Sequence, residues 1–245
     1  MLSARTAKPR FPGMRGFSLI EMAVVLVIVS VLLGGILVSL SQTQETNRRN
    51  EAEAKLDEVI QALYGFAQAT GRLPCPATAT SNGAEAPAGG GVCTRAHGFV
   101  PSATLGLTGS VNADNLLEDP WLNPYRYSVT TSNGSAFTTA NGMRTVTMTT
   151  LAPNLRVCAD TACATVIASA LPAMVLSMGA DWATFDNGDP EEVENSGEVT
   201  VSGYRMANDT DFVQRQYAED NFDDQLSWLS ASILYTKMIN AGRLP

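Results

Sequence analysis

One apolar stretch, residues 17–40, constrains the fold of this chain more than any other feature of its sequence. It reads FSLIEMAVVLVIVSVLLGGILVSL, and Glu21 is its single charged residue. As a helix, the stretch would extend over roughly 36 Å, which exceeds the hydrocarbon core of a bilayer at about 30 Å. We therefore expect a transmembrane helix at residues 17–40.

The charges on either side of this stretch predict its orientation. Residues 1–16 contain four basic residues and no acid, and the first charge beyond the stretch is Glu45. Basic residues before a membrane segment favour a cytoplasmic N-terminus, so residues 41–245 should lie outside the cytoplasm. A cleaved secretory signal is the alternative, but such signals have a shorter apolar region and a small-residue cleavage site, which this segment lacks.

The start of the apolar stretch resembles a known export signal. The run Arg15-Gly16-Phe17-Ser18-Leu19-Ile20-Glu21 is similar to the class III signal of type IV pilins and of the pseudopilins of type II secretion. The resemblance implies that a prepilin peptidase cuts between Gly16 and Phe17, removes the leader 1–16, and methylates the new terminal nitrogen of Phe17. It also implies other pilin or pseudopilin subunits and an inner-membrane assembly platform as partners.

Glu21 has a physical role in this scheme. After cleavage, the terminal ammonium of Phe17 and the carboxylate of Glu21 both lie in apolar surroundings, where an unpaired charge costs several kcal/mol. The resemblance implies that Glu21 meets the terminal amine of a neighbouring subunit and so sets the register of assembly. The alternative is that Glu21 has no role in assembly and is tolerated near the helix end because its carboxylate contacts the lipid headgroups.

The helix is expected to continue as an amphipathic segment over residues 41–70, with Gly71 and Pro74 as its stop. Its apolar residues recur at the spacing of one helical face, which should pack on a globular head formed by residues 71–245. The predicted fold is therefore α+β and pilin-like, with a long N-terminal helix, half transmembrane and half amphipathic, packed on an antiparallel sheet. The residues of the apolar face are Leu56, Val59, Ile60, Leu63, Phe66 and Ala67.

Turn signals predict the sheet of the head. The dipeptides Asn133-Gly134 and Asn141-Gly142 are typical of hairpin turns, so we expect an antiparallel sheet between about residues 125 and 150. Further strands are expected near residues 155–158, 163–168 and 173–178.

The C-terminal residues predict a strand followed by a helix. The strand should cover residues 225–229, and the helix should be capped by Ser230 and end at Gly242. Three apolar residues are expected on one face of this helix: Ile233, Leu234 and Met238.

Four cysteines in an exported chain indicate disulfides, because the compartment beyond the membrane is oxidising. The sequence permits three connectivities, and we expect the local pairs Cys75 with Cys93 and Cys158 with Cys163. Zinc is the alternative, but neither pair has the C-x2-C spacing that is usual in tetrahedral zinc sites.

Two further stretches resemble the major pseudopilins of type II secretion. Residues 119–125 read D-P-W-L-N-P-Y, and residues 177–181 read S-M-G-A-D, which is similar to the opening of a calcium-binding loop in those proteins. The resemblance makes calcium a candidate ligand, whereas a solvated acidic loop without metal is the alternative. The candidate oxygen ligands are Asp181, Asp186, Asn187 and Asp189.

Charge and residue inventory argue against two other classes of function. The net charge is -8, and removal of residues 1–16 leaves 12 basic against 24 acidic residues, a balance that disfavours nucleic acid as a partner. The single histidine, His97, is expected in a surface loop between Gly91 and Gly98, and no catalytic motif accompanies it. We therefore expect no enzyme and no required cofactor.

These observations together predict a structural subunit of a bacterial type IV pilus or type II secretion pseudopilus. The precursor should sit in the inner membrane as a single-pass protein with a periplasmic head. The mature chain of 229 residues (245 minus 16) is long for an abundant subunit, which favours a minor one. The alternative is a membrane-anchored extracytoplasmic domain that binds a ligand and never polymerises.

Overall fold

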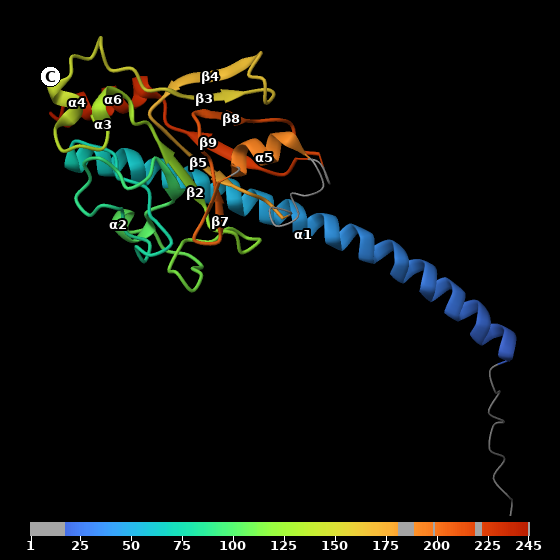
Figure 1. Ribbon diagram of the computed structural model, residues 1–245. Helices are drawn as coiled ribbons and strands as arrows, with labels where there is room; N and C mark the ends of the chain where they lie inside the picture. Colours follow the sequence, from blue (N-terminus) through green and yellow to red (C-terminus); the bar gives the residue numbers. More distant parts are fainter. Residues whose placement is uncertain (1–17, 181–188, 198, 219–221, 245) are drawn as a thin grey trace, which may run out of the picture. The chain divides into compact units, whose positions relative to one another are not determined.

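The computed structural model describes residues 18–180, 189–197, 199–218 and 222–244, without the side chains of residues 32–41 and 199 (Figure 1). The chain divides into two units, Met1–Asn47 and Arg48–Pro245. The helices are α1 (Leu19–Thr70), α2 (Ser102–Leu105), α3 (Ser132–Ser135), α4 (Gly142–Thr145), α5 (Pro190–Ser196) and α6 (Ala231–Asn240). The strands are β1 (His97–Phe99), β2 (Arg126–Val129), β3 (Leu155–Cys158), β4 (Val166–Leu171), β5 (Ala173–Ser177), β6 (Val199–Val201), β7 (Tyr204–Met206), β8 (Asp211–Val213) and β9 (Gln225–Trp228).

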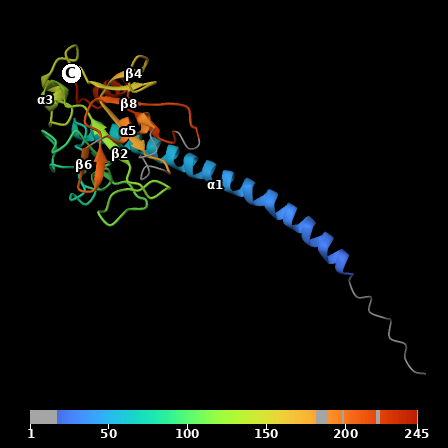
Figure 2. The ribbon, with the colours of Figure 1, turned by 45° about the vertical axis from the view of Figure 1, so that its right-hand side comes forward.

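The strands form three sheets in the second unit (Figures 1 and 2). The main sheet has the order β1-β2-β5-β9 and is antiparallel throughout. A smaller sheet has the order β4-β3-β8, in which β3 and β8 are parallel, and β6 pairs with β7. This confirms the expected α+β class, with an N-terminal helix ahead of an antiparallel sheet.

The main sheet has apolar side chains on both faces. Val175 of β5 joins the core shared with the second part of α1, whereas Met174 and Leu176 join a second core that includes Phe212 of the smaller sheet. All five residues of β5 are therefore buried. A strand covered on both faces reads as a continuous apolar run, which explains the sequence AMVLS.

The second part of α1 contributes directly to the first core. Leu56, Val59 and Leu63 are buried against the sheet, and Phe66 is half-buried, so the predicted amphipathic face is confirmed. The Tyr64 hydroxyl accepts a hydrogen bond of 3.0 Å from the backbone N–H of Ser230. This contact joins α1 to the residue that precedes α6.

The first unit holds the N-terminal part of α1. Among the residues whose side chains the structure describes, no helix contains an apolar run long enough to cross a bilayer. Phe17 and the side chains of residues 32–40, which belong to the expected transmembrane segment, lie outside the described residues.

The antiparallel sheet expected between residues 125 and 150 is confirmed only at β2, and the hairpins indicated by the turn signals do not form in this segment. β2 ends at Val129, and the short helices α3 and α4 follow it. The turn signals did mark left-handed backbone, because Asn133 and Asn141 have φ of 54° and 57°. However, the side chain of Phe137 between them is fully buried in the first core, and this packing holds the segment against the sheet instead of in a hairpin.

The strands expected at residues 155–158, 173–178 and 225–229 correspond to β3, β5 and β9, and the C-terminal helix corresponds to α6. Ser230 is the N-cap residue of α6, but its side chain makes no capping hydrogen bond. The strand expected at residues 163–168 is β4 and begins at Val166, because Cys163 belongs to a turn in which its N–H donates to the carbonyl of Asp160 at 3.0 Å. In α6, Leu234 and Met238 are buried as predicted, but Ile233 is 48% exposed. Gly242, at φ 68°, follows the end of α6.

Candidate functional sites

The first turn of α1 is closed by a reciprocal pair of hydrogen bonds. The N–H of Ser18 donates to Oε2 of Glu21 at 2.9 Å, and the N–H of Glu21 donates to Oγ of Ser18 at 3.3 Å. This arrangement is a capping box, which satisfies two backbone donors that a helix start leaves unpaired. Glu21 thus stabilises its own helix, a role that the S-x-x-E spacing in the sequence indicates but that was not predicted.

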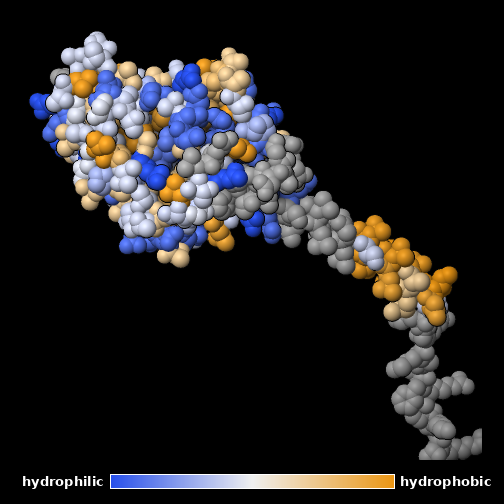
Figure 3. Space-filling view, viewed as in Figure 1, coloured by the Kyte–Doolittle hydropathy of each residue, from blue (hydrophilic) through white to orange (hydrophobic). Residues whose placement is uncertain are grey.

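Exposed apolar side chains follow this cap. In Figure 3 they form the orange surface of the N-terminal part of α1. Leu19 is 89% exposed and Val31 is 71% exposed, and the large apolar side chains between them are 42% to 72% exposed. A continuous apolar surface of this kind requires lipid or another apolar surface to cover it. Gly16 and Phe17, the predicted processing site, lie outside the described residues.

In the head, a buried turn brings together the two stretches that resemble the pseudopilins. Asp119 is 3% exposed, and its Oδ1 accepts hydrogen bonds of 2.9 Å from the N–H groups of Trp121 and Asn123. Its Oδ2 accepts a hydrogen bond of 2.6 Å from Ser177, and the Asn123 side chain donates to the carbonyl of Gly179 at 2.5 Å. Residues 119–123 and 177–179 are therefore one connected site.

The electrostatics of this turn are dominated by burial. Burial raises the pKa of the Asp119 carboxyl to about 6, although the hydrogen bonds from Ser177, Asn123 and Trp121 act in the opposite direction. The turn also holds Leu122 at φ 70° with 68% of its surface exposed. This backbone conformation is uncommon for a bulky residue, so the hydrogen bonds of Asp119 are what maintain it.

The structure describes one of the four candidate calcium ligands. Asp189 is the N-cap of α5, and its side chain accepts a hydrogen bond of 3.0 Å from the N–H of Glu191. Its other carboxylate oxygen lies 4.0 Å from the guanidinium of Arg215. In the described part of the loop, the Asp189 carboxylate therefore caps α5, and calcium binding stays a prediction. The other three candidates, Asp181, Asp186 and Asn187, lie outside the described residues.

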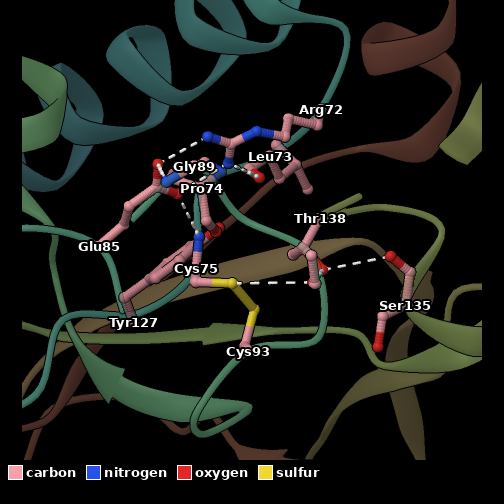
Figure 4. The surroundings of a disulfide bond; sticks show 11 residues. Arg72, Leu73, Pro74, Cys75, Glu85, Gly89, Cys93, Tyr127, Ser135 and Thr138 are labelled. Atoms are coloured by element: carbon pink, nitrogen blue, oxygen red, sulfur yellow. Dashed lines mark hydrogen bonds and ion pairs between the residues drawn. A yellow bond between two sulfur atoms is a disulfide. The ribbon is translucent and has the colours of Figure 1, made fainter. Parts of the chain in front are cut away.

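The cysteines are joined in the two local pairs, Cys75 with Cys93 and Cys158 with Cys163. Figure 4 shows the first disulfide beside a buried ion pair, in which the Arg72 guanidinium donates two hydrogen bonds of 2.7 and 2.6 Å to Glu85. Glu85 also accepts the backbone N–H of Cys75 at 3.1 Å. The disulfide and the ion pair thus fix the same segment after α1.

His97 is not in a surface loop, contrary to expectation. It begins β1, where its Nδ1 lies 2.9 Å from Oγ of Ser128 on the neighbouring strand. Burial lowers the pKa of its imidazole to about 4, against the attraction of Asp209, so the ring is neutral at pH 7. Its ring centroid lies 6.0 Å from that of Phe212. These contacts give His97 a structural role in the sheet.

Comparison with known proteins is informative at the N-terminus. No curated protein and no solved structure matches the chain. A family model described as the prokaryotic N-terminal methylation motif matches residues 12–37, a range that includes the predicted cleavage site, Ser18 and Glu21. The chain therefore carries the prepilin signal of type IV pilins and pseudopilins at its N-terminus.

Proposed function

We propose that this chain is a minor structural subunit of a type IV pilus or a type II secretion pseudopilus. The methylation motif at residues 12–37, which leads into the exposed apolar part of α1, is the observation that carries the proposal. A prepilin peptidase removes residues 1–16, and residues 17–40 hold the precursor in the inner membrane with its head in the periplasm. The assembly platform then transfers the subunit from lipid into a filament.

The apolar surface of α1 supports this sequence of events. Its side chains are exposed between residues 19 and 31, and burial of apolar surface contributes about 25 cal/mol per Å². Lipid covers this surface in the precursor, and helices of neighbouring subunits cover it in the filament. The exchange of one apolar environment for another has a small free-energy difference, so a separate motor can drive it.

The second part of the proposal assigns Glu21 two partners in succession. In the free subunit, its carboxylate caps the helix through the N–H of Ser18. During assembly, the same carboxylate pairs with the methylated terminal amine of a neighbouring Phe17. Both contacts require an acceptor oxygen, but only the second requires a negative charge.

Analysis of the mature N-terminus tests the first part. The protein is produced in a bacterium that has a prepilin peptidase, and its N-terminal peptide is identified by mass spectrometry. We expect a chain that starts at N-methylated Phe17, whereas Gly16→Val should retain residues 1–16. A wild-type chain that starts at Met1, or well beyond Phe17, would contradict the proposal.

Three variants test the role of Glu21 in assembly. Glu21→Gln keeps an acceptor oxygen for the cap but loses the charge, and Ser18→Ala loses one hydrogen bond of the cap but keeps the charge. We expect all variants, including Glu21→Ala, to be cleaved, and only the two Glu21 variants to be missing from sheared filaments. Cleavage of the wild type without incorporation into filaments would instead favour a membrane-anchored domain that does not polymerise.

A further inference from the structure

The main sheet has two edges, and the fold covers only one of them. The outer edge of β1 is paired with the segment that follows α1, because Phe99 and Ala77 exchange two backbone hydrogen bonds of 2.9 Å. At the opposite edge, β9 pairs with β5 on one side, and among the described residues no strand lies on its other side. An edge strand presents unpaired N–H and C=O groups, which natural proteins usually cover or interrupt.

The register of the sheet identifies the backbone groups of β9 that point away from β5. Leu229 donates its N–H to the carbonyl of Ala173 at 2.9 Å, and the alternate residues before Leu229 face β5 in the same way. The N–H and C=O groups of Leu226 and Trp228 therefore point outward. They have no hydrogen-bond partner in the part of the chain that the structure describes.

A groove with a volume of about 230 Å³ lies beside this open edge. It is lined by α1, by β9 and by residues 214–217, which follow β8. The Arg49 guanidinium of α1 lies 3.5 Å from the ring centroid of Tyr217, so this stack joins α1 to the segment after β8. A helix beside an open sheet edge allows an added strand to pair with the edge while its side chains contact the helix.

The accessible charges of this groove are mainly acidic. Glu53 and Asp57 lie one turn apart on α1, both are exposed, and neither has an ion pair among the described residues. Arg49 lies about two turns before Asp57 and is stacked on the ring described above, and Arg215 is paired with a carboxylate of α5 at 3.2 Å. The third carboxylate of the lining, Asp224, is buried and accepts a hydrogen bond of 2.7 Å from α5. The two carboxylates of α1 therefore favour a basic group in the groove.

We propose that this groove binds an extended segment of a partner protein, which adds a strand to β9 and carries a lysine or an arginine. The backbone groups of Leu226 and Trp228 supply the hydrogen bonds, and Glu53 and Asp57 attract the basic side chain. Charge argues against a second copy as the occupant, because the chain without its leader has 12 basic against 24 acidic residues. The proposal goes beyond the filament function and does not rest on it, because the groove lies within the second unit alone.

Selection from a displayed library of random eight-residue segments, with the full-length protein in detergent micelles as the target, tests the proposal. We expect the selected segments to be rich in β-branched residues and to contain a lysine or an arginine. Synthetic peptides of these sequences are then added to the protein, and amide hydrogen exchange is followed by NMR. The amides of Leu226 and Trp228 should exchange about tenfold more slowly with peptide. Those of Gln225 and Ser227, which already face β5, should change little.

Two kinds of variant separate strand pairing from attraction by charge. Leu226→Pro removes an N–H that makes no bond within the sheet, so β9 should still form and peptide affinity should fall about tenfold. The double variant Glu53→Gln, Asp57→Asn keeps the edge and should weaken binding about threefold to tenfold, with loss of the preference for basic segments. Glu51→Gln, a change at an exposed acid of α1 outside the groove, is the matched control and should bind as the wild type does. If Leu226→Pro does not fold, the double variant and the exchange pattern decide the question.

Three results would overturn the proposal. Selection that enriches no sequence, or segments that leave the exchange of Leu226 and Trp228 unchanged, would show that the acids of the groove only protect the edge from pairing. Slower exchange of these two amides at high protein concentration, without any peptide, would identify a second copy as the occupant instead.

Discussion

At the scale of single residues, burial separates two ion pairs that have similar geometry. Arg72 and Glu85 are paired at 2.6 Å and buried, whereas Arg156 and Asp211 are paired at 2.5 Å with the arginine side chain 44% exposed. Arg72→Met leaves Glu85 as an unpaired buried charge, so we expect the free energy of unfolding to fall by about 3 to 5 kcal/mol at pH 7. Arg156→Met should leave it nearly unchanged.

Urea unfolding of both variants in detergent micelles, followed by tryptophan fluorescence, measures this difference. The loss of unfolding free energy in Arg72→Met should be smaller in acid, because the unpaired carboxyl of Glu85 then takes up a proton. Burial raises the pKa of Glu85. The hydrogen bonds to its carboxylate and the charge of Arg72 together lower that pKa by more than burial raises it, so the net shift is downward. The wild-type pair therefore stabilises the fold above the ordinary pKa of the carboxyl and loses that contribution as pH falls. Equal losses in the two arginine variants at pH 7 would contradict this account.

His97 should make stability depend on pH in weak acid. Burial lowers its pKa from 6.5 to about 4, so the folded state binds fewer protons than the unfolded state between these values. Stability is then lost as pH falls from about 6.5 to about 4, by up to about 3 kcal/mol. The difference in unfolding free energy between the wild type and His97→Gln, measured at constant ionic strength, isolates this contribution from that of the carboxylates. A pH-independent difference would show that the imidazole stays as accessible to protons as in the unfolded chain.

At the scale of elements, α1 has two apolar surfaces with different partners. Leu63 is fully buried in the core of the head, and Val25 is 52% exposed in the first unit. Leu63→Ala removes packed methyl groups and should lower the free energy of unfolding by about 2 to 5 kcal/mol. Val25→Ala, a matched truncation on the same helix, should leave the unfolding of the head unchanged when near-UV circular dichroism in micelles is the probe. A similar loss in both variants would mean that the N-terminal part of α1 also supports the head.

The elements also show which predictions a sequence can support. The face of α1 that includes Leu56 and Leu63 was predictable, because helical periodicity is a local property. The turn signals correctly indicated left-handed backbone at Asn133 and Asn141. The secondary structure between them depends on Phe137, whose partners in the core are distant in sequence. Local turn chemistry therefore identified the backbone conformation and not the element.

At the scale of the whole molecule, the same distinction applies to the sites. The prepilin signal is contiguous and was predictable from its spacing, as the match over residues 12–37 confirms. The contact between His97 and Ser128 was not predictable, because it joins β1 to β2 through the pairing of separate strands. The connected turn at Asp119 lies between these cases. Each of its two stretches is recognisable in the sequence, but only the fold joins Asp119 to Ser177.

The two disulfides act on the whole molecule, because a cross-link restricts the entire unfolded chain. The pair Cys75 and Cys93 is separated by 18 residues, and the pair Cys158 and Cys163 by 5. Loop-closure entropy then predicts a loss of about 3 kcal/mol for the double variant Cys75→Ala, Cys93→Ala and about 2 kcal/mol for the corresponding variant of the second pair. The first loss should be increased further, because Cys75 also donates its N–H to the buried Glu85 and this anchor depends on the local backbone.

Urea unfolding under non-reducing conditions, with each double variant compared to the wild type, measures these losses. Dithiothreitol should lower the wild-type midpoint to that of the variant without any cysteine, and it should not affect that variant. Free-thiol titration of the unfolded wild type controls for incomplete oxidation. The order of the two losses is the critical result: a larger loss for Cys158 and Cys163 would mean that native contacts of β3 and β4, and not the length of the closed loop, determine what each disulfide contributes.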